Sequence, residues 1–363
     1  MKIKFTNLYK LIPKNKFFKK LNILIKKSVY VGGNEVKKFE KNFSNFVSTK
    51  YCISVANGTD ALEIAIKSLN LKKGSEIIVP NNTWISTAEA VVNNGFKLVL
   101  CDINLDDYTI CLDDLKKKTN KKTSAIIPVH LYGNPVNIKN IKKIIKNKNI
   151  KIIEDCAQAH GSKLYNKHVG GLGNVGAFSF FPSKNIGALG DAGAITTNSK
   201  KIHDFCLRYR NHGSLVKYDH SFPGRNSRLD AIQALILNIK LLDYKKVIKK
   251  RNFIANIYFE ELKKISQIEL IKRSKHCVYS FHQFVIRGSN IKKLKEYLYK
   301  NGIETMVHYP YMLNELSFFN NHKRLKKSHK LGNKILSLPI SEEHTISEIK
   351  HVVKSIKNFF NTF

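Results

Sequence analysis

Short runs of β-branched and aliphatic residues alternate with helical patterns through much of this chain, and this alternation limits the folds open to it. Strands are predicted at residues 51–55, 76–80, 98–102, 124–129 and 150–154. Helices are predicted between them, one ending near residue 69 and others at about 84–93, 112–118 and 138–146. Because strands that alternate with helices form right-handed βαβ units, we expect an α/β fold with a mostly parallel sheet, whose ligands lie at the carboxyl ends of the strands.

A change of pattern near residue 250 predicts a second, smaller unit. A long helix with an apolar face is predicted at about residues 228–251. Beyond it the pattern reads helix, strand, helix, strand, helix, and residues 278–286 form its clearest strand. We therefore expect a large domain at residues 1–250, including the N-terminal segment, and a smaller α+β domain at residues 251–363.

Lys184 stands between an aromatic run that begins at Phe178 and a glycine-rich segment that reaches Ala194. Strands are predicted on both sides, at 177–181 and 194–197, which places the lysine on the turn between two antiparallel strands. Burial lowers the pKa of a lysine, and an unprotonated amine is what formation of a Schiff base requires. A surface lysine is the competing interpretation, because the chain contains 55 lysines.

Asp155 directly follows the predicted strand at residues 150–154. A carboxylate at the carboxyl end of a central strand can keep a pyridine nitrogen protonated, and Lys184 can hold an aldehyde. Together these two groups are what a pyridoxal phosphate site needs. The alternative for Asp155 is a cap on a following helix. Gln158, a few residues further along, could reach the same pocket and donate its amide there.

Four further residues could surround such a cofactor. Gly58 and Thr59 lie where a predicted strand gives way to a helix, whose N–H groups can bind a phosphate, and an ordinary turn capped by Thr59 is equally consistent. Ser179 could aim its hydroxyl at the phosphate or bond to a neighbouring carbonyl. Trp84, the single tryptophan, could stack on the cofactor ring or pack in the core.

Several motifs, taken in order and spacing, resemble the DegT/DnrJ/EryC1/StrS family of sugar aminotransferases. They are ANGTDAL at 56–62, EDCAQAHG at 154–161, FSFFPSKN at 178–185 and NSRLDAIQA at 226–234. The likeness extends over nearly the whole chain, from residues 30–40 to residues 336–339. It implies a fold type I pyridoxal phosphate-dependent transferase, with a mostly parallel seven-stranded sheet in the large domain and a smaller C-terminal α+β domain.

The resemblance implies roles for individual residues, with Lys184 and Asp155 as the catalytic pair. The residues implied to contact the cofactor are Gly58, Thr59, Trp84, Asp155, Gln158, Ser179, Lys184 and Asn226. Asn226 is expected to come from the neighbouring subunit of a homodimer, so that each active site is shared. Arg228 and the residues His308 and Tyr309, which are otherwise turn residues before a proline, are the substrate candidates. The family often has an aromatic residue where this chain has Arg225, and no metal ligand is predicted.

The implied activity moves an amino group from an amino acid, by family analogy glutamate, to a keto group of a nucleotide-linked sugar. GALGDAGA at residues 187–194 resembles members that act on 3-keto sugars, so a dTDP- or UDP-linked 3-keto-hexose is expected, for surface polysaccharide or O-antigen biosynthesis. A 4-aminotransferase and a sugar dehydratase of the same fold are the alternatives. Related dehydratases carry His where Lys184 stands, and the lysine therefore argues against that alternative.

The formal net charge of +36 raises a more remote alternative, a basic regulatory or nucleic-acid-binding protein. Only 8 of the 63 basic residues are Arg, and the lysines are spread over predicted helices. Surfaces that bind nucleic acid depend on arginine and interleaved aromatic side chains, and no such stripe is present in the sequence. We therefore expect no nucleic-acid partner, although the charge would attract an anionic substrate.

The cysteines and the N-terminus favour a cytoplasmic protein. Six cysteines occur without a CxxC pair or a regular spacing, as expected in a reducing compartment. The N-terminus has no uninterrupted apolar stretch of the kind found in secretion signals, and the sequence contains no run of 18 apolar residues. No membrane insertion is therefore expected.

Overall fold

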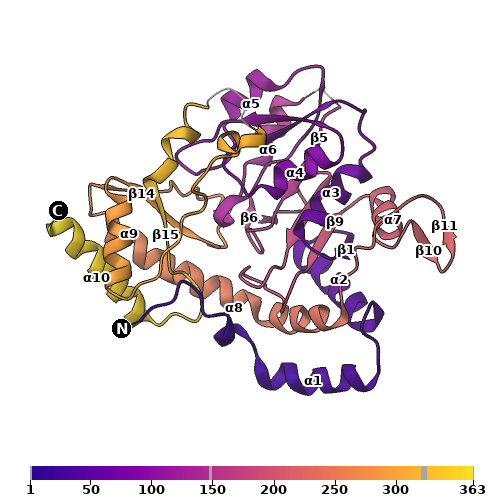
Figure 1. Ribbon diagram of the computed structural model, residues 1–363, viewed down its shortest axis with the longest axis horizontal. Helices are drawn as coiled ribbons and strands as arrows, with labels where there is room; N and C mark the ends of the chain where they lie inside the picture. The colour runs from indigo at the N-terminus through magenta and orange to yellow at the C-terminus, as the bar shows by residue number, and fades with distance from the viewer. Residues whose placement is uncertain (1, 147–148, 320–324, 363) are drawn as a thin grey trace.

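The computed structural model describes residues 2–146, 149–319 and 325–362, and its arrangement is shown in Figure 1. Its largest sheet has the strand order β1-β9-β8-β5-β4-β2-β3. The strands are β1 (Tyr51–Val55), β2 (Glu76–Pro80), β3 (Lys97–Cys101), β4 (Thr123–Ile126), β5 (Lys151–Asp155), β8 (Val175–Ser179) and β9 (Gly193–Thr197). Only β9 runs antiparallel to its neighbours. The predicted α/β class and mostly parallel seven-stranded sheet are confirmed, with strand ends shifted by a few residues.

Helices cover both faces of this sheet, because alternate residues of its buried strands point to opposite sides. On one face, Ile77 and Ile153 pack with α3 (Gly58–Ser68), α4 (Ser86–Asn93) and α7 (Lys200–Tyr209). On the other face, Ile152 and Phe178 belong to cores built with the remaining helices. These helices are α2 (Gly33–Val47), α5 (Leu112–Lys118), α6 (Ile138–Ile144) and the first half of α8 (Ala231–Leu262).

A second core lies at the C-terminal end of the chain. Its antiparallel sheet consists of β12 (Ile268–Leu270), β14 (Phe284–Gly288) and β15 (Ile335–Leu338). Helices α9 (Ile291–Lys300), α10 (Ile346–Thr362) and the second half of α8 pack with it. The N-terminal residue Ile3 is buried in the same core. The helix expected at 228–251 begins at Ala231 and continues to Leu262, so α8 runs beneath both units in Figure 1 and crosses the predicted domain boundary at residue 250, which stays a prediction.

The expectation of one strand over residues 278–286 is wrong. Cys277–Val278 (β13) pairs instead with β6 (Lys163–Leu164), which forms a small sheet with β7 (Lys167–His168). The strand β14 of the C-terminal sheet begins only at Phe284. Between the two strands, Phe281 has a positive φ of 43°, and the backbone leaves the extended path. This break brings the side chains that follow Phe281 to the large domain.

The remaining elements lie at the periphery. Helix α1 (Lys14–Lys26) packs along α8. The hairpin β10–β11 (Ser214–Val216 and Asp219–His220) projects from the right side of the molecule in Figure 1. The short 3-10 helices are η1 (Leu8–Leu11), η2 (Leu131–Gly133), η3 (Leu313–Glu315), η4 (Ser317–Phe319), η5 (Ser328–Lys330) and η6 (Gly332–Lys334). None of the helices in the described ranges has both the length and the apolar character needed to span a bilayer.

Candidate active site

A pocket of about 440 Å³ opens where β5 and β8 end. It receives side chains from the start of α3, from the segment before α4, from both strand ends and from the C-terminal unit. Most of the predicted site residues line it, namely Gly58, Thr59, Trp84, Asp155, Gln158, Ser179, Lys184, His308 and Tyr309. The structure therefore brings together groups as far apart in the sequence as Gly58 and Tyr309, as expected for a site at the carboxyl edge of a parallel sheet.

Asp155 is the last residue of β5, and its carboxyl group is buried. Burial raises its pKa, and hydrogen bonds and nearby charge oppose that rise. The backbone N–H of Ala157 donates to Oδ1 at 3.1 Å, and the hydroxyl of Thr87 donates to Oδ2 at 2.8 Å. Residues 157–158 form a turn and not a helix, so the helix-cap interpretation of Asp155 is wrong. The two hydrogen bonds, one of them from the buried Thr87 hydroxyl, fix the orientation of the carboxyl group.

Lys184 lies on the turn between β8 and β9, which pair as antiparallel strands as predicted. Its backbone N–H donates to the carbonyl of Phe181 at 2.8 Å, which closes the turn. Burial lowers the pKa of the Lys184 amine to about 8, and the charge of Asp155 opposes this shift. An amine with such a pKa exchanges its proton readily near neutral pH. The surface-lysine interpretation does not hold, because the side chain lines the pocket.

The start of α3 forms an anion-binding corner of the pocket. Asn57, and not Thr59, caps this helix, since its side chain accepts from the N–H of Asp60 at 2.8 Å. The N–H groups of Gly58 and Thr59 have no hydrogen-bond partner among the described residues. A Cβ atom on Gly58 would lie 2.6 Å from Cβ of Ser179, so only glycine fits there. Two free donors at a helix N-terminus suit a phosphate group.

The opposite wall combines aromatic and amide groups. Gln158 accepts from the N–H of Tyr132 at 2.8 Å, and its amide donates to the Tyr309 hydroxyl at 2.8 Å. The rings of Trp84 and Tyr309 lie 5.4 Å apart, and Trp84 is 58% exposed, which excludes the core interpretation of this tryptophan. His308 Nδ1 lies 2.9 Å from the Ser337 hydroxyl, and burial lowers the pKa of His308 to about 4. His308 is therefore a neutral hydrogen-bonding group at physiological pH.

His282 and Gln283 are among the pocket residues that were not predicted from the sequence, as is Thr87. His282 and Gln283 follow the backbone break at Phe281 and therefore could not be located from a predicted continuous strand. Nδ1 of His282 lies 2.9 Å from Oδ1 of Asn185, the residue after Lys184. Burial lowers the pKa of His282 well below its usual value, so a neutral imidazole supports the lysine turn from behind. The sequence signal that could have indicated them is the pair of polar residues, His and Gln, directly after Phe281.

Two predicted residues, Asn226 and Arg228, do not line the pocket of their own chain. Both are exposed, and Nε of Arg228 donates to Oδ1 of Asn226 at 3.0 Å. They follow the projecting hairpin β10–β11. Arg225, in the position where an aromatic residue was expected from the family, forms ion pairs with Asp60 at 2.7 Å and Glu63 at 2.6 Å. The segment 225–228 therefore contacts α3 through Arg225 and exposes Asn226 and Arg228 to solvent.

Pyridoxal phosphate suits the chemistry of this pocket. A volume of about 440 Å³ lies within the usual range for a small-molecule site. The unpaired donors of Gly58 and Thr59 match its phosphate, the Asp155 carboxylate matches a ring nitrogen, and the Lys184 amine matches an aldehyde. Trp84 offers an exposed ring on the same pocket for stacking.

One group in the described ranges has the composition of a metal site, but hydrogen bonds occupy it. His130, Glu154 and Cys156 place ligand atoms within 4.8 Å of one another. Nδ1 of His130 accepts from the N–H of Val136 at 2.9 Å, so its other nitrogen carries the proton and donates to Glu154 at 3.0 Å. Burial raises the pKa of the Cys156 thiol well above its usual value. These three side chains therefore form part of the buried core, and none of them has an atom free to bind a metal ion.

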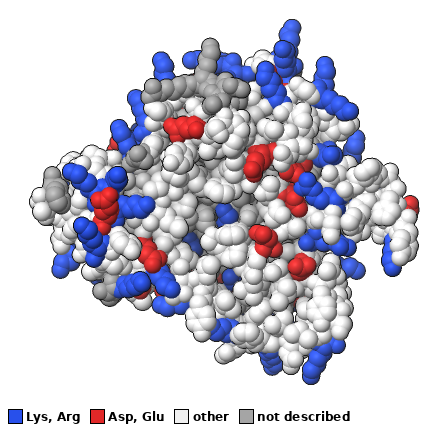
Figure 2. All heavy atoms as spheres, in the orientation of Figure 1, with Lys and Arg blue, Asp and Glu red and all other residues white. Residues whose placement is uncertain are grey.

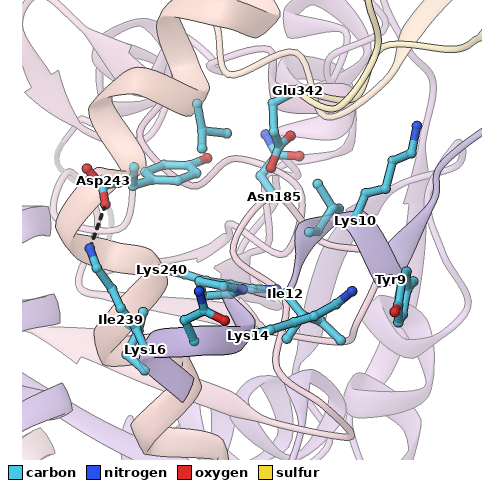
Figure 3. A pocket seen from close by; sticks show the side chains of 15 residues that line it. Tyr9, Lys10, Ile12, Lys14, Lys16, Asn185, Ile239, Lys240, Asp243 and Glu342 are labelled. Atoms are coloured by element: carbon cyan, nitrogen blue, oxygen red, sulfur yellow. Dashed lines mark ion pairs between the residues drawn. The ribbon is translucent and has the colours of Figure 1, made fainter. Parts of the chain in front are cut away.

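A larger cavity of about 640 Å³ lies between the N-terminal segment and α8 (Figure 3). Four lysines line it, Lys10, Lys14, Lys16 and Lys240. Lys240 donates to the carbonyl of Gly187 at 2.7 Å, and burial lowers its pKa to about 8. Asp243, paired with Lys16 at 3.8 Å, lies on α8 and not at a strand end. The smaller pocket is the better reaction site, because only it combines a carboxylate at a strand end with a buried amine.

Comparison with known proteins agrees with this geometry. Residues 12–357 match the model of the DegT/DnrJ/EryC1/StrS aminotransferase family. The chain is 38% identical over 341 residues to a dTDP-3-amino-3,6-dideoxy-alpha-D-galactopyranose transaminase from Aneurinibacillus thermoaerophilus, with 93% of this chain and 94% of the relative covered. The predicted family and the aminotransferase class are confirmed.

Two solved structures share the whole fold. The crystal structure of DesV from S. venezuelae superposes with a TM-score of 0.96 at 29% identity, covering 99% of this chain and 98% of that chain. The structure of NtdA from Bacillus subtilis with bound cofactor PMP has a TM-score of 0.91 at 27% identity, covering 99% and 85%. The predicted fold type I architecture and the predicted pyridoxal phosphate dependence of the family are confirmed. On its pocket geometry and on these similarities, the chain belongs to the DegT/DnrJ/EryC1/StrS aminotransferase family.

Proposed function

We propose that this protein transfers an amino group from an amino acid, by family analogy glutamate, to the 3-keto group of a dTDP- or UDP-linked hexose. The observation that carries the proposal is the convergence of Asp155 and Lys184 on one pocket beside the unpaired donors of Gly58 and Thr59. The relative from A. thermoaerophilus, whose name describes a dTDP-3-amino sugar transaminase, supports carbon 3 as the position. Such amino sugars belong to surface polysaccharides such as O-antigens.

Pyridoxal phosphate, when bound, supplies a conjugated ring that accepts electrons from the bond being broken. Asp155 would hold a proton at the ring nitrogen, since its carboxyl group is kept in position by Thr87 and Ala157. Gly58, Thr59 and Ser179 would hold the phosphate at the other end. Trp84 would cover the ring face and exclude water from it.

Lys184 is the group that moves the proton. Because its pKa is about 8, Nζ can take a proton from the α-carbon of the amino donor and would deliver it to the bound cofactor, and the reverse transfer would place a proton on the sugar carbon in the second half of the reaction. The charge of Asp155 raises the Lys184 pKa, and burial lowers it, so a change in either one alters the fraction of free amine. His282 and Asn185 would keep the lysine turn in place during both transfers.

The substrate would enter beside the C-terminal unit. Tyr309 and His308 face the pocket from that side, and both have polar atoms suited to sugar hydroxyl groups. Figure 2 shows Lys and Arg mostly around the rim of the face in view, and several Asp and Glu nearer its middle among uncharged residues. A basic surround of this kind attracts a nucleotide diphosphate without forming an arginine stripe for nucleic acid.

The shared site requires a homodimer in which Asn226 of each subunit completes the other. Asn226 and Arg228 are exposed beside a projecting hairpin and lie outside their own pocket, which supports this arrangement. Arg228 would then meet the substrate of the partner. We place the enzyme in the cytoplasm, because all six cysteines are free.

The test incubates the purified protein with pyridoxal phosphate, glutamate and a panel of 3-keto and 4-keto sugar nucleotides, with products identified by mass and NMR. A 3-amino sugar without net loss of water is the expected product. A 4-amino product would replace the assignment of carbon 3, and a deoxy product lacking nitrogen would identify a dehydratase. Salt-dependent binding to duplex DNA with no cofactor absorbance would instead identify a binding protein of the same fold.

A further inference from the structure

Successive side chains of the segment 225–228 point to alternate sides, as they do along an extended backbone. Ser227 is fully buried and Arg225 forms ion pairs, and both side chains contact the first turns of α3. Asn226 and Arg228 point the other way, are exposed, and bond to each other. One short segment therefore has an inner side attached to α3 and an exposed outer side, where Arg228 also donates to Oδ1 of Asn211 at 3.4 Å.

The inner side contacts the anion-binding corner at two points. The Ser227 hydroxyl donates to Oδ2 of Asp60 at 2.6 Å and accepts from the N–H of Ala56 at 3.1 Å. These two residues stand on either side of Asn57, Gly58 and Thr59. Ser227 thus joins the two ends of the turn whose unpaired N–H groups face the pocket.

Arg225 supplies the charge that this corner requires. Its Nη1 lies 2.7 Å from Oδ1 of Asp60 and 2.6 Å from Oε2 of Glu63, whose side chains are 15% and 10% exposed. Glu63 also accepts from the amide of Asn93 at 2.8 Å. Two carboxylates on the first turns of α3 would repel a phosphate bound at its N-terminus, and Arg225 balances them.

We propose that Arg225 is a positioning residue that sets the phosphate corner of its own subunit and, at the same time, the place of Asn226 in the partner's site. Arg225 does not line the pocket of its own subunit, so it would act there through Asp60 and Glu63. The proposal rests on the proposed function for the identity of the bound phosphate and for the dimer. The proposal explains why this chain can have arginine where the family often has an aromatic residue, because Asp60 and Glu63 form ion pairs with it.

The first test measures pyridoxal phosphate affinity of the full-length protein by quenching of Trp84, the single tryptophan, which lines the pocket. Arg225→Gln should weaken binding by roughly three- to tenfold, more strongly at low salt than at high salt. Removing one excess acid in Arg225→Gln/Glu63→Gln should restore much of the affinity. Arg208→Gln removes a charge whose one side-chain bond to another described residue is to the Ser221 hydroxyl at 2.9 Å, and this control should bind like the wild type.

A second test separates the two halves of the proposal. In mixed dimers that combine one Lys184→Ala subunit with one subunit that retains Lys184, only the latter can develop the visible absorbance of lysine-bound cofactor. Arg225→Gln is placed either in the subunit that retains Lys184 or in its partner. Both placements should lower cofactor retention after gel filtration, the first through the phosphate corner and the second through Asn226.

Three results would count against the proposal, two of them against the whole and one against the charge argument. The first is a wild type and an Arg225→Gln variant that bind pyridoxal phosphate equally at low salt, and the second is a loss of retention for only one of the two placements. If the wild type itself bound no pyridoxal phosphate, the proposed function would fail first, so the two failures are distinguishable. An equal loss in Arg225→Gln and Arg225→Gln/Glu63→Gln would show a purely steric role and would also refute the charge argument.

Discussion

Replacing Lys184 by methionine in the cofactor-free protein should stabilise it at neutral pH. Burial lowers the pKa of Lys184 from 10.5 to about 8, so the folded state holds a proton on this amine less tightly than the unfolded state does. A difference of about 2.5 pKa units corresponds to roughly 3 kcal/mol of destabilisation at pH 7, where both states carry the charge. Methionine has a similar length and no charge, and it removes this penalty.

The sign of the pH dependence follows from proton counting. Between about pH 8 and 10.5 the unfolded wild type binds one more proton than the folded wild type, so its stability rises with pH by up to about 1.4 kcal/mol per unit. The advantage of Lys184→Met should therefore shrink across this window and level off above it.

The assay is urea unfolding followed by circular dichroism at several pH values, with the protein concentration held constant. Lys275→Met is the matched control, because Lys275 is exposed and is solvated in both states. The free energy of unfolding of the control should differ from that of the wild type by the same amount at every pH. A difference between Lys184→Met and wild type that stays constant within about 0.5 kcal/mol from pH 7 to 10.5 would refute a desolvated lysine.

Three further variants test the pocket and its support. Thr87→Val removes the hydroxyl that donates to Asp155, so the pKa of that carboxyl should rise further and the amino-donor half-reaction should slow about tenfold or more at pH 7 in single-turnover kinetics. Gly58→Ala brings a methyl group within 2.6 Å of Ser179 Cβ and should weaken pyridoxal phosphate binding by about tenfold in a fluorescence titration. Glu154 accepts from the backbone N–H groups of Gly170, Leu172 and Gly173. Glu154→Gln replaces one accepting oxygen by an NH2 group and removes the charge, and it should lower the free energy of unfolding by about 3 kcal/mol or more in urea. For Thr87→Val the control is Thr196→Val, a buried hydroxyl bonded to the Gly170 carbonyl, which should affect stability but not the half-reaction. Equal kinetics in both threonine variants, unchanged cofactor affinity in Gly58→Ala, or a wild-type midpoint in Glu154→Gln would each contradict the corresponding argument.

The sheet could be predicted because its information is local. Buried parallel strands appear as short aliphatic runs, and Ile77, Ile78 and Ile153 carry that signal without reference to the rest of the chain. The same holds for Asp155, the last residue of β5, and for Lys184, on the turn that follows β8, since both come after such a run at the edge of the sheet where ligands bind. For α8, the apolar pattern located the helix but not its end, because its second half packs against a different core.

Other parts of the site depended on contacts between distant segments. The break at Phe281, which places His282 and Gln283 at the pocket, exists because β13 pairs with β6 and β14 pairs with β15, and no local pattern records those choices. Likewise, nothing within residues 225–228 indicates that Arg225 turns toward Asp60, 165 residues away.

The sequence by itself determined the α/β class, the family and the residues at the strand ends, because hydrophobic periodicity and local motifs act over a few residues. Only the tertiary structure decided the electrostatics: that Thr87 is committed to Asp155, that the Lys184 pKa falls to about 8, and that Arg225 balances the acids of α3. The physical reason is that desolvation and charge pairing depend on which side chains share a volume, and that is settled by packing between segments far apart in the chain.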